Sequence, residues 1–138
     1  MSLVDYSEMK DEINNAPEPK VLKAGTEVKV RIVKINTGIS EKNDCGWKSI
    51  VFDVPADPMV KEFNDFFWNL DRDKLDSKSY ERTKYQYRIF GAAFGIDYAR
   101  PIDFEEELPG KEGWVIVGTK KSDEYGEQNN VKKYLAKK

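Results

Sequence analysis

The sequence predicts a mainly β chain with a helical insertion, folded as a five-stranded Greek-key barrel with one or two helices. Two stretches near the start, 26–35 and 47–54, have the alternating or β-branched pattern of strands. The stretch 78–94 has aromatic residues at helical spacing. Two more β-rich stretches, 113–121 and 130–135, follow, so strands enclose the helical part. The 138 residues make one domain of ordinary size.

The composition favours a cytoplasmic protein that makes no membrane contact. Hydrophobic residues make up 39% of the chain, enough for one core, but no window approaches 18 uninterrupted apolar residues, which excludes an integral membrane protein. The first residues are acidic and lack the basic-then-apolar order of a secretory signal.

The residue types also exclude several kinds of catalysis. Cys45 is the single cysteine, so there is no internal disulfide and no thiolate metal cage, and there is no histidine to serve a catalytic triad. The carboxylates from which a two-metal site could be built do not have a spacing that fixes a metal ion. We therefore expect a non-enzymatic protein without cofactor or metal. These carboxylates are Asp53, Asp57, Asp71, Asp73 and Asp76.

The chain divides into a polar arm over residues 1–20 and a single domain over residues 21–138. The arm contains two prolines and reads as loosely held, and the pattern changes sharply at Gly25. In the first expected strand, Val28 and its alternating apolar partners face one way, while Lys29 and Arg31 face the other.

The second expected strand, Trp47–Val54, forms a hairpin with the first across a turn-rich loop. A helix is then expected over 57–70, because Asp57 is a good N-cap and apolar residues recur at three- and four-residue spacing. A second helix is expected over 78–94, with Gly95 as a left-handed C-cap. The acidic run 103–107 favours a solvated loop.

The last two strands, 113–121 and 130–135, flank a turn and carry most of the basic charge. Residues 113–138 hold 6 basic and 3 acidic side chains, whereas the whole chain has a net charge of −2. Paired lysines at this end are typical of a site for an anionic ligand. They are equally typical of an edge strand whose charges keep it soluble and prevent pairing with another strand. Trp114, within a Val-Ile-Val run, is expected in the core.

The order of strands and helices fits a Greek-key barrel of the oligonucleotide-binding (OB) type. Such barrels bind single strands by combining positive side chains with aromatic rings on which bases stack. Trp47 could equally cap the core, and Tyr134 could cover the end of the barrel. The candidate nucleic-acid-binding residues are Lys29, Arg31, Trp47, Lys48, Lys120, Lys121, Tyr125, Lys132 and Tyr134.

The C-terminal hairpin resembles the ending of phage and prophage single-stranded DNA-binding proteins. The residues that carry the resemblance are Leu108–Lys111, Val115–Gly118, Tyr125–Gly126 and Asn129–Leu135, and the similarity extends over roughly residues 22–136. The resemblance implies an OB barrel and sequence-independent binding of single strands in phage replication or recombination, inside the bacterial host cell.

This resemblance implies single-stranded DNA as the main partner, together with phage recombination or replication proteins. The acidic tail by which many bacterial single-strand binders recruit partners is absent, because the chain ends in Lys137 and Lys138. The alternative is a phage protein-interaction module that captures a host or replication protein without binding nucleic acid, through the acidic region 103–107. The sequence leaves homo-oligomerisation and the preference for DNA over RNA open.

Overall fold

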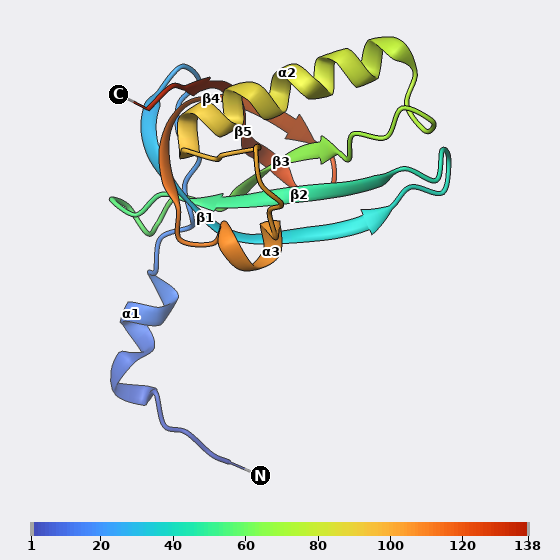
Figure 1. The fold of residues 1–138 in the computed structure, drawn as a ribbon. Helices are drawn as coiled ribbons and strands as arrows, with labels where there is room; N and C mark the ends of the chain where they lie inside the picture. The colour runs from blue at the N-terminus through green and yellow to red at the C-terminus, as the bar shows by residue number, and fades with distance from the viewer. Residues whose placement is uncertain (1, 138) are drawn as a thin grey trace.

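The computed structural model describes residues 2–137 and is mainly β. One five-stranded antiparallel sheet carries helix α2 across one side, and a short helix α3 lies near its end (Figure 1). Two short helical segments precede the sheet. The elements are η1 (Ser7–Met9), α1 (Lys10–Asn14), β1 (Glu27–Ile39), β2 (Gly46–Asp53), β3 (Phe63–Trp68), α2 (Ser77–Phe94), α3 (Phe104–Glu107), β4 (Glu112–Ser122) and β5 (Gly126–Leu135).

The strands follow the order β3-β2-β1-β4-β5, so β3 and β5 are the two edges. These edges approach each other, but within residues 2–137 no backbone ladder joins them, and the sheet is not closed into a barrel. Side chains meet there instead: the Tyr134 hydroxyl of β5 donates to Asp65 Oδ2 of β3 over 2.6 Å. The mainly β prediction is confirmed, whereas the closed barrel is not what these residues form.

Strand β1 belongs to both halves of the sheet. Its first part, up to Arg31, pairs with β4, and its second part, from Arg31 onward, pairs with β2. A bulge between Ile32 and Lys34 shifts the register by one residue. Ile35 therefore faces the core and Lys34 faces solvent, although strict alternation from Ile32 would have reversed them.

The core lies between the sheet and α2. Asp76 caps the start of α2 by accepting a hydrogen bond from the Ser79 amide, and Gly95 ends it with a left-handed φ of 71°. The predicted helix over 78–94 is therefore confirmed, as are both predicted hairpins. From α2, Phe90 and Phe94 pack among aromatic rings of the sheet.

The helix predicted over 57–70 is wrong, because this segment contains strand β3. Phe63 and Phe67 face the core, whereas Phe66 is exposed on the opposite face. Aromatic residues on both faces of a strand imitate the spacing of a helical stripe. Asp57 does not begin a helix but accepts a hydrogen bond from the Met59 amide in a turn.

The acidic run 103–107 is a helical turn rather than the predicted loop. The Asp103 carboxylate accepts a hydrogen bond from the Glu106 amide and so caps α3. Arg100 pairs with Glu107 over 2.6 Å, which pins the preceding connection to this turn. The pKa of the Glu107 carboxyl is lowered by its hydrogen bond from Arg100.

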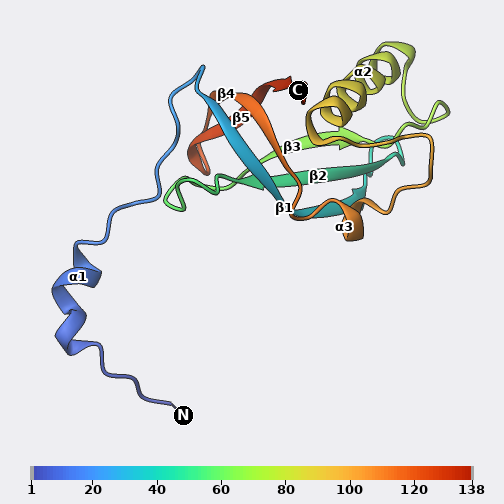
Figure 2. The same ribbon diagram turned by 60° about the vertical axis from the view of Figure 1, so that its left-hand side comes forward.

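The arm stands away from the domain in both ribbon views (Figures 1 and 2). All of residues 2–20 are exposed, and among the described elements η1 and α1 contact only each other. The arm joins the domain where Lys20 bridges to Val60 in parallel fashion. Over residues 2–137, no helix combines the length and the apolar character needed to cross a membrane.

Candidate nucleic-acid interface

Three aromatic rings gather on the outer face of β2 and β3, and we call them the aromatic platform: Trp47, Phe66 and Trp68. Trp47 and Trp68 are cross-strand partners. The Phe66 ring lies 5.8 Å from Trp47 and 4.9 Å from Trp68 between centroids. Phe66 is 43% exposed, and both tryptophans are half-buried. Such a group presents ring surface to solvent instead of to the core.

Trp47 owes its position to a glycine on the neighbouring strand. Gly38 of β1 is its cross-strand partner, and a Cβ placed there would lie only 2.5 Å from Trp47 Cζ2. The indole therefore lies against bare backbone. Close approach of this kind is a reason for glycine inside a strand.

Gly38→Ala is expected to displace the Trp47 ring and so disturb the aromatic platform. The added methyl group overlaps an aromatic side chain that can move outward, so the fold should survive with a small loss of stability. The tryptophan emission maximum should shift to longer wavelength, because Trp47 becomes more exposed. An unchanged emission spectrum in the folded variant would contradict this packing.

Polar side chains continue the outer face beside the aromatic platform. Lys34 and Asn36 of β1 are exposed, and their cross-strand partners Val51 and Ser49 lie on β2. The Asn64 amide on β3 donates to Ser49 Oγ over 2.6 Å. A cation and amide groups next to exposed rings are the groups that contact phosphates and bases.

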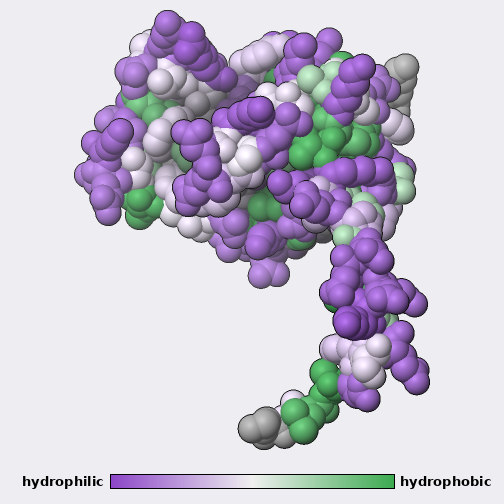
Figure 3. Space-filling model, turned by 180° about the vertical axis from the view of Figure 1, so that it is seen from behind, coloured by the Kyte–Doolittle hydropathy of each residue, from purple (hydrophilic) through white to green (hydrophobic). Residues whose placement is uncertain are grey.

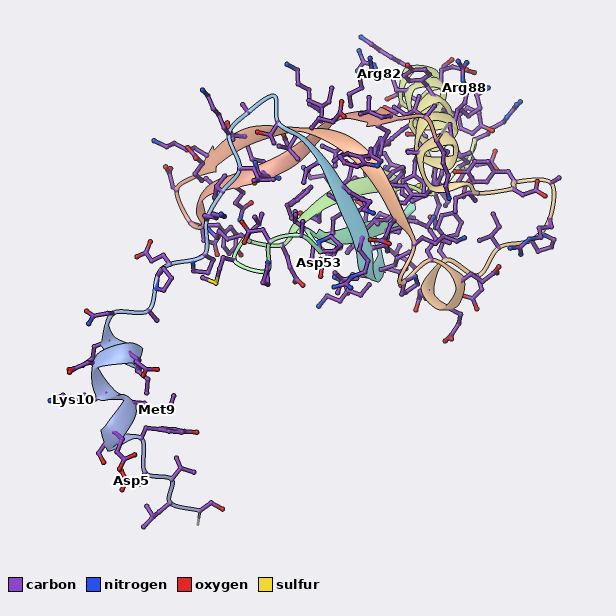
Figure 4. All side chains as sticks on the ribbon, turned by 90° about the vertical axis from the view of Figure 1, so that its left-hand side faces the viewer. Asp5, Met9, Lys10, Asp53, Arg82 and Arg88 are labelled. Carbon is purple, nitrogen blue, oxygen red and sulfur yellow. The ribbon has the colours of Figure 1, made fainter. Side chains whose placement is uncertain are left out.

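Lys29 and Arg31 lie on the same side, on the first half of β1. Arg31 makes a two-point ion pair with Asp53, at 3.1 and 2.6 Å, and this carboxylate raises the pKa of the guanidinium. Figure 4 shows Asp53 at this position in the sheet. Lys29 is the cross-strand partner of Trp114, which is 48% exposed, so the predicted core position of Trp114 is wrong.

Lys120, Lys121 and Tyr125 lie at the tip of the β4–β5 hairpin. All three are exposed, with Tyr125 at 63%. In the turn itself, the Tyr125 amide donates to Ser122 Oγ over 3.2 Å. The predicted exposure of this aromatic residue is confirmed, while its role in binding stays a prediction.

The hairpin tip and the aromatic platform lie at opposite ends of β3. Lys61, just before β3, reaches the Glu127 carbonyl at the start of β5 over 3.4 Å. Trp68 lies at the far end of the strand, about 17 Å from Phe63 along β3. Figure 2 also shows the β4–β5 and β1–β2 turns on opposite sides of the sheet. The structure therefore separates Tyr125 from Trp47.

Tyr134 is not available to stack on a base. It is 6% exposed, its ring packs among those of Phe52, Phe90 and Phe94, and its hydroxyl is held by Asp65. Its cross-strand partner, Val115, faces the core as well, which explains the inward direction. Lys132, two residues earlier on β5, is exposed.

Lys48 follows Trp47 on β2 and therefore points to the opposite side of the sheet. Its ammonium donates to Asn69 Oδ1 over 2.6 Å and to the Tyr87 hydroxyl over 2.8 Å, and it lies 4.6 Å from the Phe104 ring centroid. Burial lowers the pKa of Lys48 to about 8. Lys48 is thus separate from the outer face that carries the aromatic platform.

We expect Lys48→Met to change how stability depends on pH. In the folded protein the ammonium loses its proton near pH 8, whereas the unfolded chain keeps it to about 10.5. The folded pKa is lowered, so the charge opposes folding below pH 8, and deprotonation relieves this cost between these values. Relative to Lys48→Met, the wild type should gain about 1 kcal/mol in free energy of unfolding between about pH 7.5 and about pH 9.5, allowing for solvent screening.

Urea unfolding of both proteins at the two pH values measures this gain. The buried Cys45 thiol, whose pKa is raised by burial, acts in the opposite direction but is common to both proteins. An identical pH dependence in the two proteins would show that Lys48 keeps its ordinary pKa.

Phe66 and Trp68 were not among the residues singled out in the sequence, because their segment was expected to be helical. The feature of the sequence that indicates these two residues is the run Phe66-Phe67-Trp68. In a strand, three successive aromatic residues must place rings on both faces. With Phe67 buried, its two neighbours necessarily point outward.

The outer face of β1, β2 and β3 thus combines clustered aromatic rings, amides and lysine side chains. Figure 3 shows another view of the molecule, in which hydrophobic patches are separated by hydrophilic side chains. This chemistry suits a ligand with flat apolar groups joined by an anionic backbone. Compared with models of known families the chain matches none, and among curated proteins it matches none either.

Proposed function

We propose that this protein binds single-stranded DNA without sequence preference, using the outer face of β1, β2 and β3. The observation that carries the proposal is the aromatic platform, because clustered rings that are partly open to solvent on a strand face offer π-surfaces to any base. The backbone phosphates would follow the neighbouring lysines and amides, with Lys34 as the nearest strand cation.

The arrangement of the strands supports an OB-like fold. An OB domain is a five-stranded, partly open Greek-key barrel that binds oligonucleotides on the face of its second and third strands. Here the sheet order is β3-β2-β1-β4-β5, the main helix lies between β3 and β4, and the edges approach each other through Tyr134 and Asp65. The aromatic platform occupies the corresponding strand face.

The energetics are compatible with useful affinity despite a net charge of −2. Stacking contributes about 1–3 kcal/mol per base, so a platform of three rings suffices for binding without a strongly basic surface. Few phosphate contacts then imply a moderate dependence on salt. The lysines of the β4–β5 hairpin would extend the path for a longer strand.

In this proposal the protein is a non-enzymatic binder that protects single strands during phage DNA replication or recombination. Coating a single strand blocks nucleases and prevents base pairing. The C-terminal residues that resemble phage single-strand binders support this role. Replication or recombination proteins of the phage would then be its protein partners.

The test is a fluorescence-anisotropy titration of labelled oligo-dT, oligo-rU and a duplex of equal length, at about 50 and 200 mM salt. We expect the protein to bind oligo-dT much more tightly than the duplex, and less tightly at the higher salt. The oligo-rU arm measures the preference for DNA. Absence of binding to every probe at low salt would reject the proposal and leave a protein-interaction module.

A further inference from the structure

The arm carries both apolar and acidic side chains, but none of its described apolar side chains is buried. Met9 and Ile13, four residues apart in the short helical segment Ser7–Asn14, form an apolar stripe, and Tyr6 directly precedes this segment. All three are at least 46% exposed. Glu12 lies three residues after Met9, beside this stripe, and Asp5 precedes the helical segment, where its carboxylate accepts a hydrogen bond from the Ser7 amide.

The charge of the arm is predominantly negative. Between residues 2 and 14 it has four carboxylates and one lysine, Lys10. In Figure 4, Asp5, Met9 and Lys10 stand clear of the domain. A short segment of this kind gains little stability alone, since helices under about 12 residues are marginal in water. A partner surface that stabilises this segment would cover its stripe with apolar groups and place basic groups near its carboxylates.

A pocket with that chemistry lies on the side of the sheet opposite the aromatic platform. Its volume is about 660 Å³, within the roughly 300–1,000 Å³ of ligand-sized sites. Apolar and aromatic side chains line it, and three cations border it. None of its described lining residues carries a carboxylate. They are Lys48, Asn69, Leu70, Lys84, Tyr87, Arg88, Gly91, Ala92, Ile96, Tyr98 and Phe104.

The cations of this pocket are only partly matched within the chain. Lys48 contacts a neutral amide and a phenol, and lies over the Phe104 ring. Arg88 lies over the ring of Tyr85, 5.5 Å from its centroid, at an exposed position of α2. Lys84 pairs with Glu81 over 3.0 Å. Lys48 also lines the adjoining pocket that carries Asp103, Glu105 and Glu107, so the cation that an acidic apolar segment would match is Arg88.

We infer that the arm of one copy docks into the pocket of a second copy, with the Met9 stripe against the apolar lining and Asp5 and Glu12 near Arg88. The apolar stripe of the arm then contacts the apolar lining of the pocket, and the acidic side chains of the arm lie near the basic side chains at the border of the pocket. The inference does not depend on nucleic acid, so it holds or fails separately from the proposed function.

The geometry favours a neighbour's pocket over the chain's own. The arm is anchored where Lys20 meets Val60, at one end of β3, whereas Asn69 and Leu70 of the pocket follow the other end. From Lys20 to Met9 the chain spans at most about 27 Å, counting extended and helical parts. About 17 Å of this would be used along β3 before the chain turned around the sheet edge toward α2.

Docking of an arm into a different surface of the next copy is a head-to-tail contact. Such a contact forms closed dimers or rings where copies can exchange arms, and open chains where they cannot. In either case we expect the apparent mass of the protein to rise above that of the monomer as the concentration increases. Because acidic and basic groups meet at the contact, the association should weaken as salt is added.

Sedimentation velocity of the full chain without nucleic acid tests the inference. Wild type should associate at low salt, while Met9→Glu and Arg88→Glu should each weaken association at least tenfold. The matched controls Lys10→Glu, beside the stripe, and Arg82→Glu, an exposed α2 residue outside the pocket, should associate like wild type (Figure 4).

Mixing the two defective variants gives the decisive result. The Met9→Glu copy keeps an intact pocket and the Arg88→Glu copy keeps an intact arm, so together they should form a 1:1 dimer and nothing larger. All four substituted residues are exposed, so the variants should fold. A monomeric wild type at every concentration, equal loss in the controls, or a mixture that stays monomeric would each overturn the inference.

Discussion

The double variant Trp47→Ala/Phe66→Ala is expected to bind oligo-dT at least about 30-fold more weakly than wild type. Each lost stacking contact costs about 1–3 kcal/mol, and these two rings lie on the outer face of adjacent strands. The fold should persist, because neither ring belongs to the buried core. Anisotropy titration measures the affinity, and circular dichroism confirms the fold.

Trp114→Ala is the matched control for this double variant. Trp114 is also a solvent-exposed tryptophan on a strand, but it lies beside Lys29 and not on the aromatic platform. We expect it to bind nearly like wild type. Unchanged affinity in the folded double variant would remove the platform from the site, and a loss confined to Trp114→Ala would move the bound strand to β1 and β4.

Phe90→Ala is expected to lower the free energy of unfolding by about 3–5 kcal/mol. Phe90 is fully buried in α2, and its ring lies 5.2 Å from Phe67 of β3 and 5.6 Å from Tyr134 of β5. It therefore contacts both edges of the sheet at once. Since no backbone ladder joins these edges in residues 2–137, this ring holds them together.

Urea unfolding followed by tryptophan fluorescence measures this loss. Tyr85→Ala, on the exposed face of the same helix, is the control and should cost less than about 1 kcal/mol. A Phe90→Ala loss as small as that of the control would show that the two edges are held by other contacts. The Tyr134 hydroxyl bond to Asp65 would then be the first alternative.

The sequence predicted the elements whose local pattern has a single interpretation. In β1, charged and apolar residues alternate, and α2 has both a capping aspartate, Asp76, and a left-handed glycine, Gly95. Strand β3 lacked such a signal. Its rings at Phe63, Phe66 and Phe67 satisfy helical and strand spacing equally well, and only pairing with β2 decides between them.

The candidate site was less predictable than the fold, because it depends on which face each strand buries. Trp47 and Lys48 were grouped as neighbours in sequence, yet a strand sends them to opposite sides. For Tyr134 the sequence left open whether it stacks on a base or covers the end of the barrel, and the aromatic core draws it inward. Trp114 looked buried in an apolar run but points to solvent.

The bulge in β1 determines how far the structural effect of a substitution extends through the sheet. Because the strand passes from β4 to β2 at this point, it is a spine common to two three-stranded units. Along the backbone ladders, β2 joins β1 to β3, and β4 joins β1 to β5. Ile32 and Ile35 lie on either side of the bulge, so a substitution at either residue should disturb both three-stranded units. This short stretch should therefore tolerate the least variation in the whole sheet.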